Sequence, residues 1–248
     1  MVSQLPSQTE QSQVIYPDSD GQPMANNTKQ FRWIVVIQQN LDWQYANDPN
    51  VFVAGDLFWY PVEGKPKIVN APDVMVVLGR PKGDRGSYQQ WNEDNIAPQV
   101  VFEILSPGNT QEEMERKLLF YDRYGVQEYY IYNPDNNQLR GWIRGEDGLD
   151  TIASLSDWVS PQLGIRFDLS GEELQIYHPD GTRFLSYTEI SQQLEQEQQQ
   201  LEQERQRAQQ AEEQLEQERQ RAEAERQRAE AMEELLRKYR DRFGELPE

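Results

Sequence analysis

The sequence predicts a mixed α/β domain, in which helices pack on a β-sheet, followed by one long charged α-helix. Short β-branched runs alternate with amphipathic stretches in the middle of the chain, and this strand, helix, strand succession indicates a mixed sheet. All six tryptophans lie between Trp33 and Trp158, which places the packed core there. Residues 189–242 contain neither glycine nor proline and consist almost wholly of Gln, Glu, Arg, Ala and Leu, so they predict the long helix.

These patterns divide the chain into four segments. Residues 1–28 are polar, and we expect an arm that is disordered or lies as a strap on the domain. The folded domain is predicted over 29–188, because eleven of the twelve tyrosines precede residue 188. The long helix follows over 189–242, and residues 243–248 form a short tail.

Composition excludes several classes of protein. The chain carries 24 basic and 43 acidic residues, a net charge of −19, which argues against a basic protein that coats nucleic acid. It has no cysteine, so a disulfide scaffold, a zinc knuckle and a thiol nucleophile are all excluded. No apolar run approaches a membrane span and the first residues do not form a signal peptide, so we expect a cytoplasmic protein without a membrane partner.

The first half of the domain predicts one helix and three strands. Periodicity over residues 31–45 allows a buried helix or a strand, and a helix is favoured because the apolar pattern continues past the β-branched run. Strands are expected within 51–60, 73–78 and 99–105, which are β-branched runs bounded by Pro, Gly or Asn.

The second half predicts another helix and a series of strands. Thr110 is a candidate N-cap for a helix that has acidic residues in its first turn and ends at Gly125. Strands are expected over 128–133 and 138–144, joined by the turn-forming sequence Pro-Asp-Asn-Asn. Further short strands are expected as far as Tyr177.

Two carboxylates occupy strand positions where chemistry is expected. Asp73 opens one strand, and Glu103 interrupts the apolar run VVFEIL, where an unpaired carboxylate would be costly to bury. On neighbouring strands these groups could share a divalent cation, Mg²⁺ or Mn²⁺, since hard cations prefer oxygen ligands. Lys117 lies on the following helix, where an ammonium could orient water or offset charge on a phosphate. Alternatively, Glu103 faces solvent at a sheet edge and Lys117 lies on a solvated helix face.

Four segments occur in an order that resembles a known family: APDVMVV at residues 71–77, VVFEILSP at 100–107, Lys117 with Tyr121, and YGVQEYYIYNP at 124–134. Over residues 28–188 the chain resembles the Uma-two family of bacterial “putative restriction endonucleases”, within the PD-(D/E)XK nuclease superfamily. The resemblance implies a restriction endonuclease-like fold and magnesium-dependent hydrolysis of phosphodiester bonds in DNA.

The resemblance also implies residue roles. Asp73 is the aspartate of the PD element and Glu103 the acidic residue of the second element, and together they would hold the metal. The superfamily pattern expects lysine two residues after Glu103, where this chain has Leu105. In the family that lysine is moved to the next helix, which makes Lys117 the third catalytic residue. We expect three further residues to support the site: Tyr121, Glu113 and Ser106.

Two other features are weaker candidates. The loop GRPKGDRG at residues 79–86 lacks the Gly-Lys-Ser/Thr ending of a phosphate loop, and its composition favours a flexible loop. Its basic residues are nevertheless the best candidates for touching a phosphate: Arg80, Lys82 and Arg85. His178 is the only histidine and lies in a turn that we expect to be exposed, so a catalytic triad is not favoured.

The C-terminal helix has an apolar residue at every seventh position: Leu194, Leu201, Ala208, Leu215, Ala222, Ala229 and Leu236. The companion position three residues on is mostly Glu, so a weak coiled coil competes with a single charged helix. A homodimer could form through this helix or through the core. We therefore predict a metal-dependent endonuclease, with a catalytically inactive scaffold on a nuclease fold, oligomerising through the helix, as the alternative.

Overall fold

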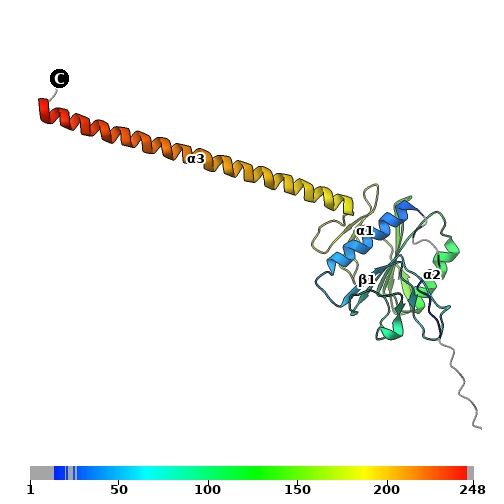
Figure 1. The fold of residues 1–248 in the computed structure, drawn as a ribbon. Helices are drawn as coiled ribbons and strands as arrows, with labels where there is room; N and C mark the ends of the chain where they lie inside the picture. The colour runs from blue at the N-terminus through cyan, green and yellow to red at the C-terminus, as the bar shows by residue number, and fades with distance from the viewer. Residues whose placement is uncertain (1–13, 20, 22–24, 26, 245–248) are drawn as a thin grey trace, which may run out of the picture. The chain divides into compact units, whose positions relative to one another are not determined.

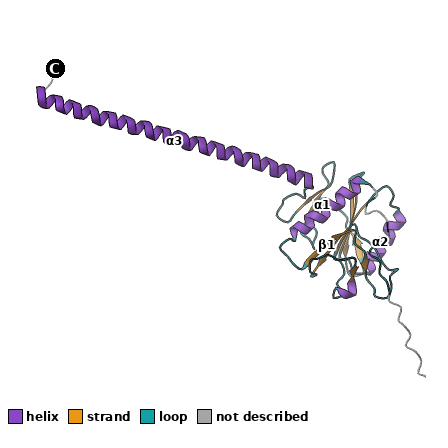
Figure 2. Cartoon of the chain, in the orientation of Figure 1, coloured by secondary structure: helices purple, strands orange, loops and turns teal. Residues whose placement is uncertain are grey.

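The computed structural model describes residues 14–19, 21, 25 and 27–244. The chain divides into two compact units, the first ending at Tyr187 and the second beginning at Thr188 (Figure 1). The first unit contains the sheets and the helices that pack on them, and the second is helical (Figure 2). The predicted mixed α/β fold class with a long C-terminal helix is therefore confirmed.

A six-stranded mixed sheet forms the centre of the first unit, with the strand order β1-β3-β5-β6-β7-β8. Only β5 and β6 are parallel among its neighbouring pairs, and the chain crosses between them through α2 (Gln111–Arg123). The strands are β1 (Val51–Gly55), β3 (Val74–Leu78), β5 (Val100–Ile104), β6 (Glu128–Asn133), β7 (Gln138–Arg144) and β8 (Leu149–Thr151).

Two small two-stranded sheets complete the unit. They are the parallel pair β2 (Trp59–Tyr60) with β4 (Tyr88–Gln89), and the antiparallel pair β9 (Arg166–Asp168) with β10 (Gln175–Tyr177). A 3₁₀ turn, η1 (Gln90–Asn92), follows β4. The run predicted as a strand over 51–60 contains two strands, because Asp56 adopts a φ of 47° and ends β1.

Helix α1 (Thr28–Gln44) covers one face of the sheet, as Figure 1 shows. Its N-cap is Asn27, whose side chain accepts a hydrogen bond from the backbone N–H of Gln30. Apolar side chains at helical spacing are buried in the core on this face: Trp33, Ile34, Ile37 and Leu41. The helix predicted for this segment is confirmed, since the hydrophobic stripe extends over several turns.

Helix α2 covers the opposite face. The Thr110 hydroxyl accepts a hydrogen bond from the backbone N–H of Glu113, as the N-cap prediction requires, and Gly125 follows the C-cap with a φ of 93°. Met114 and Tyr121 are the buried residues of this helix and belong to the second hydrophobic core. The two helices thus enclose the sheet from both sides.

Part of the predicted N-terminal arm contacts the domain. The Tyr16 ring lies 5.2 Å from the ring of Tyr60 and 4.9 Å from that of Trp91. The Tyr60 hydroxyl donates a hydrogen bond to the carbonyl of Pro17. Residues 14–19 therefore form a strap, while 1–13, 20, 22–24 and 26 lie outside the described residues.

The second unit contains α3 (Tyr187–Phe243), a helix of 57 residues, except for its first residue. At about 1.5 Å per residue its length is on the order of 85 Å. None of its described side chains is buried. Across the described part of the chain, every helix is either too short or too polar to cross a membrane. Residues 245–248 of the predicted tail lie outside the described residues.

Candidate active site

Glu103 lies on the sheet face that α2 covers. Side chains alternate along β5, so that Val101 and Glu103 point to this face while Phe102 and Ile104 point to the α1 face. Glu103 is 2% exposed. The solvent-exposed alternative for this carboxylate is therefore wrong, and its charge needs partners inside the protein.

Two residues of α2 supply those partners. The ammonium Nζ of Lys117 lies 2.8 Å from Oε2 of Glu103, and the Tyr121 hydroxyl donates a hydrogen bond to Oε1 at 2.5 Å. Lys117 and Tyr121 are four residues apart, so they project from the same side of the helix. Burial alone would lower the pKa of Lys117, but the carboxylates of Glu103 and Asp73 raise it above its usual value. The lysine is thus held in its charged form.

Asp73 is the neighbour of Glu103 across the sheet. In the antiparallel pair of β3 and β5, Val74 lies opposite Phe102. Continuing this register by one residue brings Asp73 opposite Glu103. The backbone N–H of Ile104 donates a hydrogen bond to Oδ2 of Asp73 at 2.6 Å. Burial and then the nearby carboxylate of Glu103 raise the pKa of Asp73 to about 8, against the opposing effects of Lys117 and this hydrogen bond. The two acids therefore form one electrostatic unit.

Two residues absent from the predicted site lie beside it. The first is Asp56, whose carboxylate contributes to the raised pKa of Asp73. Its backbone N–H donates hydrogen bonds to the carbonyls of Pro72 and Asp73, which fixes the chain end of β1 against β3. An acidic residue after a strand is common in turns, so the sequence offered no signal that distinguished Asp56.

The second is Tyr129 on β6, a fully buried residue whose ring packs 4.9 Å from that of Tyr121. Within the described residues its hydroxyl has no hydrogen-bond partner. Burial raises the pKa of Tyr129 strongly, and the carboxylates of Glu103 and Asp73 raise it further, so both lie near this hydroxyl. A buried polar group without a protein partner is uncommon in a folded protein, and this makes the Tyr129 hydroxyl a candidate member of the site.

Comparisons with known proteins address the family of the chain. Residues 3–170 match the model of the Uma2 family, described as “Putative restriction endonuclease”. The match covers more than half of the chain. The chain belongs to the Uma2 family.

Membership confirms the resemblance found in the sequence and makes the chain a member of a nuclease family. Among solved structures, one match is a “putative nuclease belonging to DUF820” from Anabaena variabilis ATCC 29413. The two chains share 15% identity with a TM-score of 0.39, over 54% of this chain and 72% of that one. No curated protein matches the chain.

The predicted supporting residues Glu113 and Ser106 meet through Asn109 at the start of α2. The Asn109 side chain donates hydrogen bonds to both carboxylate oxygens of Glu113 at 3.3 Å. Its Oδ1 accepts hydrogen bonds from the backbone N–H and the hydroxyl of Ser106. Glu113 also raises the pKa of Lys117. This network joins the end of β5 to the first turn of α2 and so helps to place Lys117.

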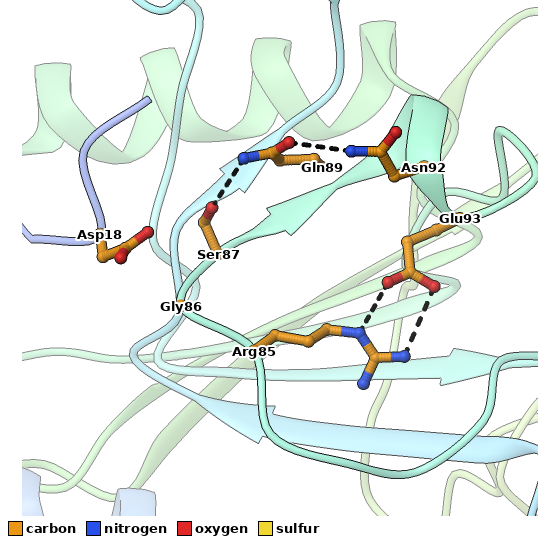
Figure 3. A pocket seen from close by; sticks show the side chains of 7 residues that line it. All are labelled: Asp18, Arg85, Gly86, Ser87, Gln89, Asn92 and Glu93. Carbon is orange, nitrogen blue, oxygen red and sulfur yellow. Dashed lines mark hydrogen bonds and ion pairs between the residues drawn. The ribbon is translucent and has the colours of Figure 1, made fainter. Parts of the chain in front are cut away.

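The three basic residues of the predicted phosphate loop are paired with carboxylates. Arg80 pairs with Glu93 and Asp94, and Lys82 pairs with Asp42. Arg85 pairs with Glu93 at 2.7 Å, and Figure 3 shows this pair at the wall of a pocket of about 320 Å³. The phosphate-binding role of this loop stays a prediction, and it would require these cations to exchange their present partners.

His178 is buried, so the exposed turn expected for it is wrong. It is 5% exposed, and its Nδ1 lies 2.9 Å from Oε1 of Gln44. Its ring packs between those of Trp43 and Phe184, and burial lowers its pKa. The sequence-based expectation failed because α1 covers this turn, a contact that composition does not reveal.

The chemistry of the two acids suits a divalent cation. The described residues contain no group of three or more His, Cys, Asp and Glu side chains that could hold a metal ion. Asp73 and Glu103 nevertheless offer hard oxygen ligands side by side, and each carboxylate oxygen has a lone pair beyond its present hydrogen bond. Burial and then the nearby carboxylate of Glu103 raise the pKa of Asp73, and a bound cation would favour its ionised form against both effects.

Proposed function

We propose that this chain is a metal-dependent endonuclease that hydrolyses phosphodiester bonds in DNA. One observation carries the proposal: the buried Glu103 carboxylate receives Lys117 and Tyr121 from α2 and has Asp73 as its neighbour on the next strand. A buried acid pair beside a charged lysine is expensive to maintain, and such groups concentrate at functional sites.

Asp73 and Glu103 would hold Mg²⁺ or Mn²⁺, with the remaining ligands coming from water and the substrate phosphate. When bound, such a cation acts as a Lewis acid on the phosphate and makes water more acidic at neutral pH.

The other residues act on the same centre. Lys117 positions the attacking water or offsets the charge that develops on the phosphate. Tyr121 fixes the orientation of Glu103 through its hydrogen bond, and Glu113 and Ser106 hold the first turn of α2 in place. The net charge of −19 opposes the approach of DNA, so the reaction depends on positive charge concentrated at the site.

Cleavage of supercoiled plasmid by the full chain, with and without Mg²⁺ or Mn²⁺, tests the proposal. Glu103→Gln keeps the shape of the side chain and should reduce cleavage at least a hundredfold, and Asp73→Asn should do the same. Glu112→Gln is the matched control, because Glu112 is an exposed acid on α2. Equal cleavage by the wild type and Glu103→Gln, with both folded, would overturn the proposal. Titration calorimetry with Mn²⁺ alone should show a saturable site that both site variants lose.

A second function, oligomerisation through α3, has its own supporting observation. The leucines of the seven-residue register are exposed: Leu194, Leu201, Leu215 and Leu236. A repeat of seven is the period of a two-stranded coiled coil, so we propose a second copy of this helix as the partner.

Light scattering on the full chain checks this pairing. The wild type should have twice the monomer mass, and Leu201→Gln with Leu215→Gln should shift it toward monomer. Leu235 is equally exposed but lies outside the register, so Leu235→Gln should leave the mass unchanged. A monomeric wild type at high concentration would contradict the dimer without affecting the endonuclease proposal.

A further inference from the structure

Arg140 lies in line with the acid pair across the sheet. Glu103 on β5 is paired with Ile131 on β6, and Ile131 is paired with Arg140 on β7. With neighbouring strands about 4.8 Å apart, the backbone of Arg140 is on the order of 10 Å from that of Glu103. The carboxylates and this arginine therefore occupy one row of the sheet.

Arg140 also lies on the same face as those acids. Trp142, two residues further along β7, packs in the core under α2 and is paired with Tyr129. Because side chains alternate along a strand, Arg140 shares the face of Trp142. Its guanidinium carbon lies 5.8 Å from the centroid of the Trp142 ring. The ring thus supports the cation beside the site.

This arginine differs from its neighbours in having no acidic partner. Arg140 is exposed, and no carboxylate in the described part of the chain forms an ion pair with it. Arg144, on the same strand, pairs with Asp122, and the arginines of the loop at 79–86 pair with Glu93. Before residue 188 the chain has 14 basic and 26 acidic residues, so positive charge is scarce on this domain.

The chemistry of the group suits a phosphate. A guanidinium presents a planar fork of donors that matches phosphate oxygens, and stacking on an aromatic ring orients this fork before binding. A separation on the order of 10 Å corresponds to about two to three nucleotides along a DNA duplex, at about 3.4 Å per nucleotide.

We propose that Arg140, supported by the Trp142 ring, binds a backbone phosphate of the DNA strand that is cut at Asp73 and Glu103. The inference rests on the proposed endonuclease function and identifies the residue that positions the strand at this site. It assigns Arg140 a role that the sequence pattern did not indicate, since an arginine in an exposed strand position is common.

Binding of a fluorescent DNA duplex to the full chain, measured by anisotropy over a range of salt concentrations, tests the proposal. All proteins carry Glu103→Gln and are measured with Mg²⁺, so that the DNA stays intact. Arg140→Gln should weaken binding about tenfold and reduce the slope of log K against log salt by about 0.9, the value for one lost phosphate contact. Arg140→Lys should keep the slope, because the charge remains, while binding more weakly than arginine.

Arg166→Gln is the matched control, since Arg166 lies 4.2 Å from the centroid of the Tyr177 ring on the separate β9–β10 sheet. It should bind as the parent does. If Arg140→Gln leaves both affinity and slope unchanged while the wild type still cleaves DNA, Arg140 is not the phosphate contact and the endonuclease proposal stands. If the wild type neither cleaves nor binds the duplex, both proposals fail.

Discussion

The ammonium of Lys117 on α2 lies 2.8 Å from the carboxylate of Glu103 on β5, with both side chains largely removed from water. The superfamily pattern has its lysine two residues after the acid, on the same strand, where this chain carries Leu105. Leu105 packs in the core under α2 instead. Lys117 on α2 therefore places beside Glu103 the positive charge that β5 itself does not provide.

The first prediction concerns this pair. Lys117→Met leaves Glu103 buried without its counter-charge, so the free energy of unfolding should fall by about 3–5 kcal/mol. The double variant with Glu103→Gln should recover part of that loss, since no charge remains to be neutralised. Urea denaturation measures both. The exposed pair between Arg116 and Glu112 on the same helix is the control, and Arg116→Met should cost less than about 1 kcal/mol. Equal losses for the two single variants would contradict the prediction.

The second prediction compares two buried tyrosines. Tyr121→Phe removes the donor to Oε1 of Glu103 and should lower the free energy of unfolding by about 1–3 kcal/mol. Tyr129→Phe removes a hydroxyl without a partner in the described structure and should be neutral or slightly stabilising. Both substitutions delete the same atom, so denaturation curves give a direct comparison. A larger loss for Tyr129→Phe would show that its hydroxyl has a structural partner.

The third prediction follows from the pKa of Asp73, which is raised from 3.8 to about 8. Between about pH 4 and pH 8, Asp73 is ionised in the unfolded chain but protonated in the folded protein. This carboxyl group therefore makes the free energy of unfolding fall as pH rises, and the fall levels off above about pH 8. Without metal, Asp73→Asn should therefore match the wild type near pH 4 and exceed it by a few kcal/mol at pH 8.

Asp168 provides the control for this pH dependence. Its carboxylate also accepts a backbone N–H bond, from Ser170, but it is only partly buried and its pKa is lowered, chiefly by that hydrogen bond. Asp168→Asn should show no gain in stability at pH 8. A wild type that grows more stable from pH 5 to pH 8, relative to Asp73→Asn, would contradict the raised pKa of Asp73.

The fourth prediction concerns the basic loop. Arg85 pairs with Glu93, and its guanidinium carbon lies 4.0 Å from the centroid of the Phe52 ring. Burial opposes ionisation of Glu93, but Arg85 and Arg80 together lower its pKa. Arg85→Gln should thus lower the free energy of unfolding by about 1–3 kcal/mol. Lys82→Gln, whose pair with Asp42 is more exposed, should cost less. If this loop binds phosphate, Arg85→Gln should instead reduce the dependence of DNA affinity on salt concentration.

Local sequence patterns correctly predicted the helices and strands whose formation depends on a few neighbouring residues. The N-cap at Thr110 and the strands over 128–133 and 138–144 were predicted correctly, since capping and alternation act over a few residues. The parallel pairing of β2 with β4 was not predicted, because it joins two-residue strands that lie far apart in sequence. The helix over 31–45 could be chosen over a strand only through the length of its apolar stripe.

The candidate site was predictable in its residue types but not in its contacts. A carboxylate in the run VVFEIL indicated that Glu103 needs a partner, yet only the docking of α2 shows that Lys117 and Tyr121 reach it. The sequence did not single out Tyr129 among the aromatic residues of EYYIYN, because the feature that sets it apart is a hydroxyl without a hydrogen-bond partner in the described structure. The sequence did not indicate the proposed role of Arg140, because its alignment with Glu103 depends on how β5, β6 and β7 pair in the sheet.

If the chain cleaves DNA as proposed, the division of the site between β5 and α2 has a consequence for the safety of the host chromosome. A molecule in which α2 has detached still carries both acids on the sheet, but it has lost Lys117 and the tyrosine that orients Glu103. Cleavage that depends on all of these residues is then restricted to fully folded molecules. Nascent, damaged or partly unfolded copies would be inert toward DNA, and the docking of one helix would act as a built-in check on the quality of the enzyme.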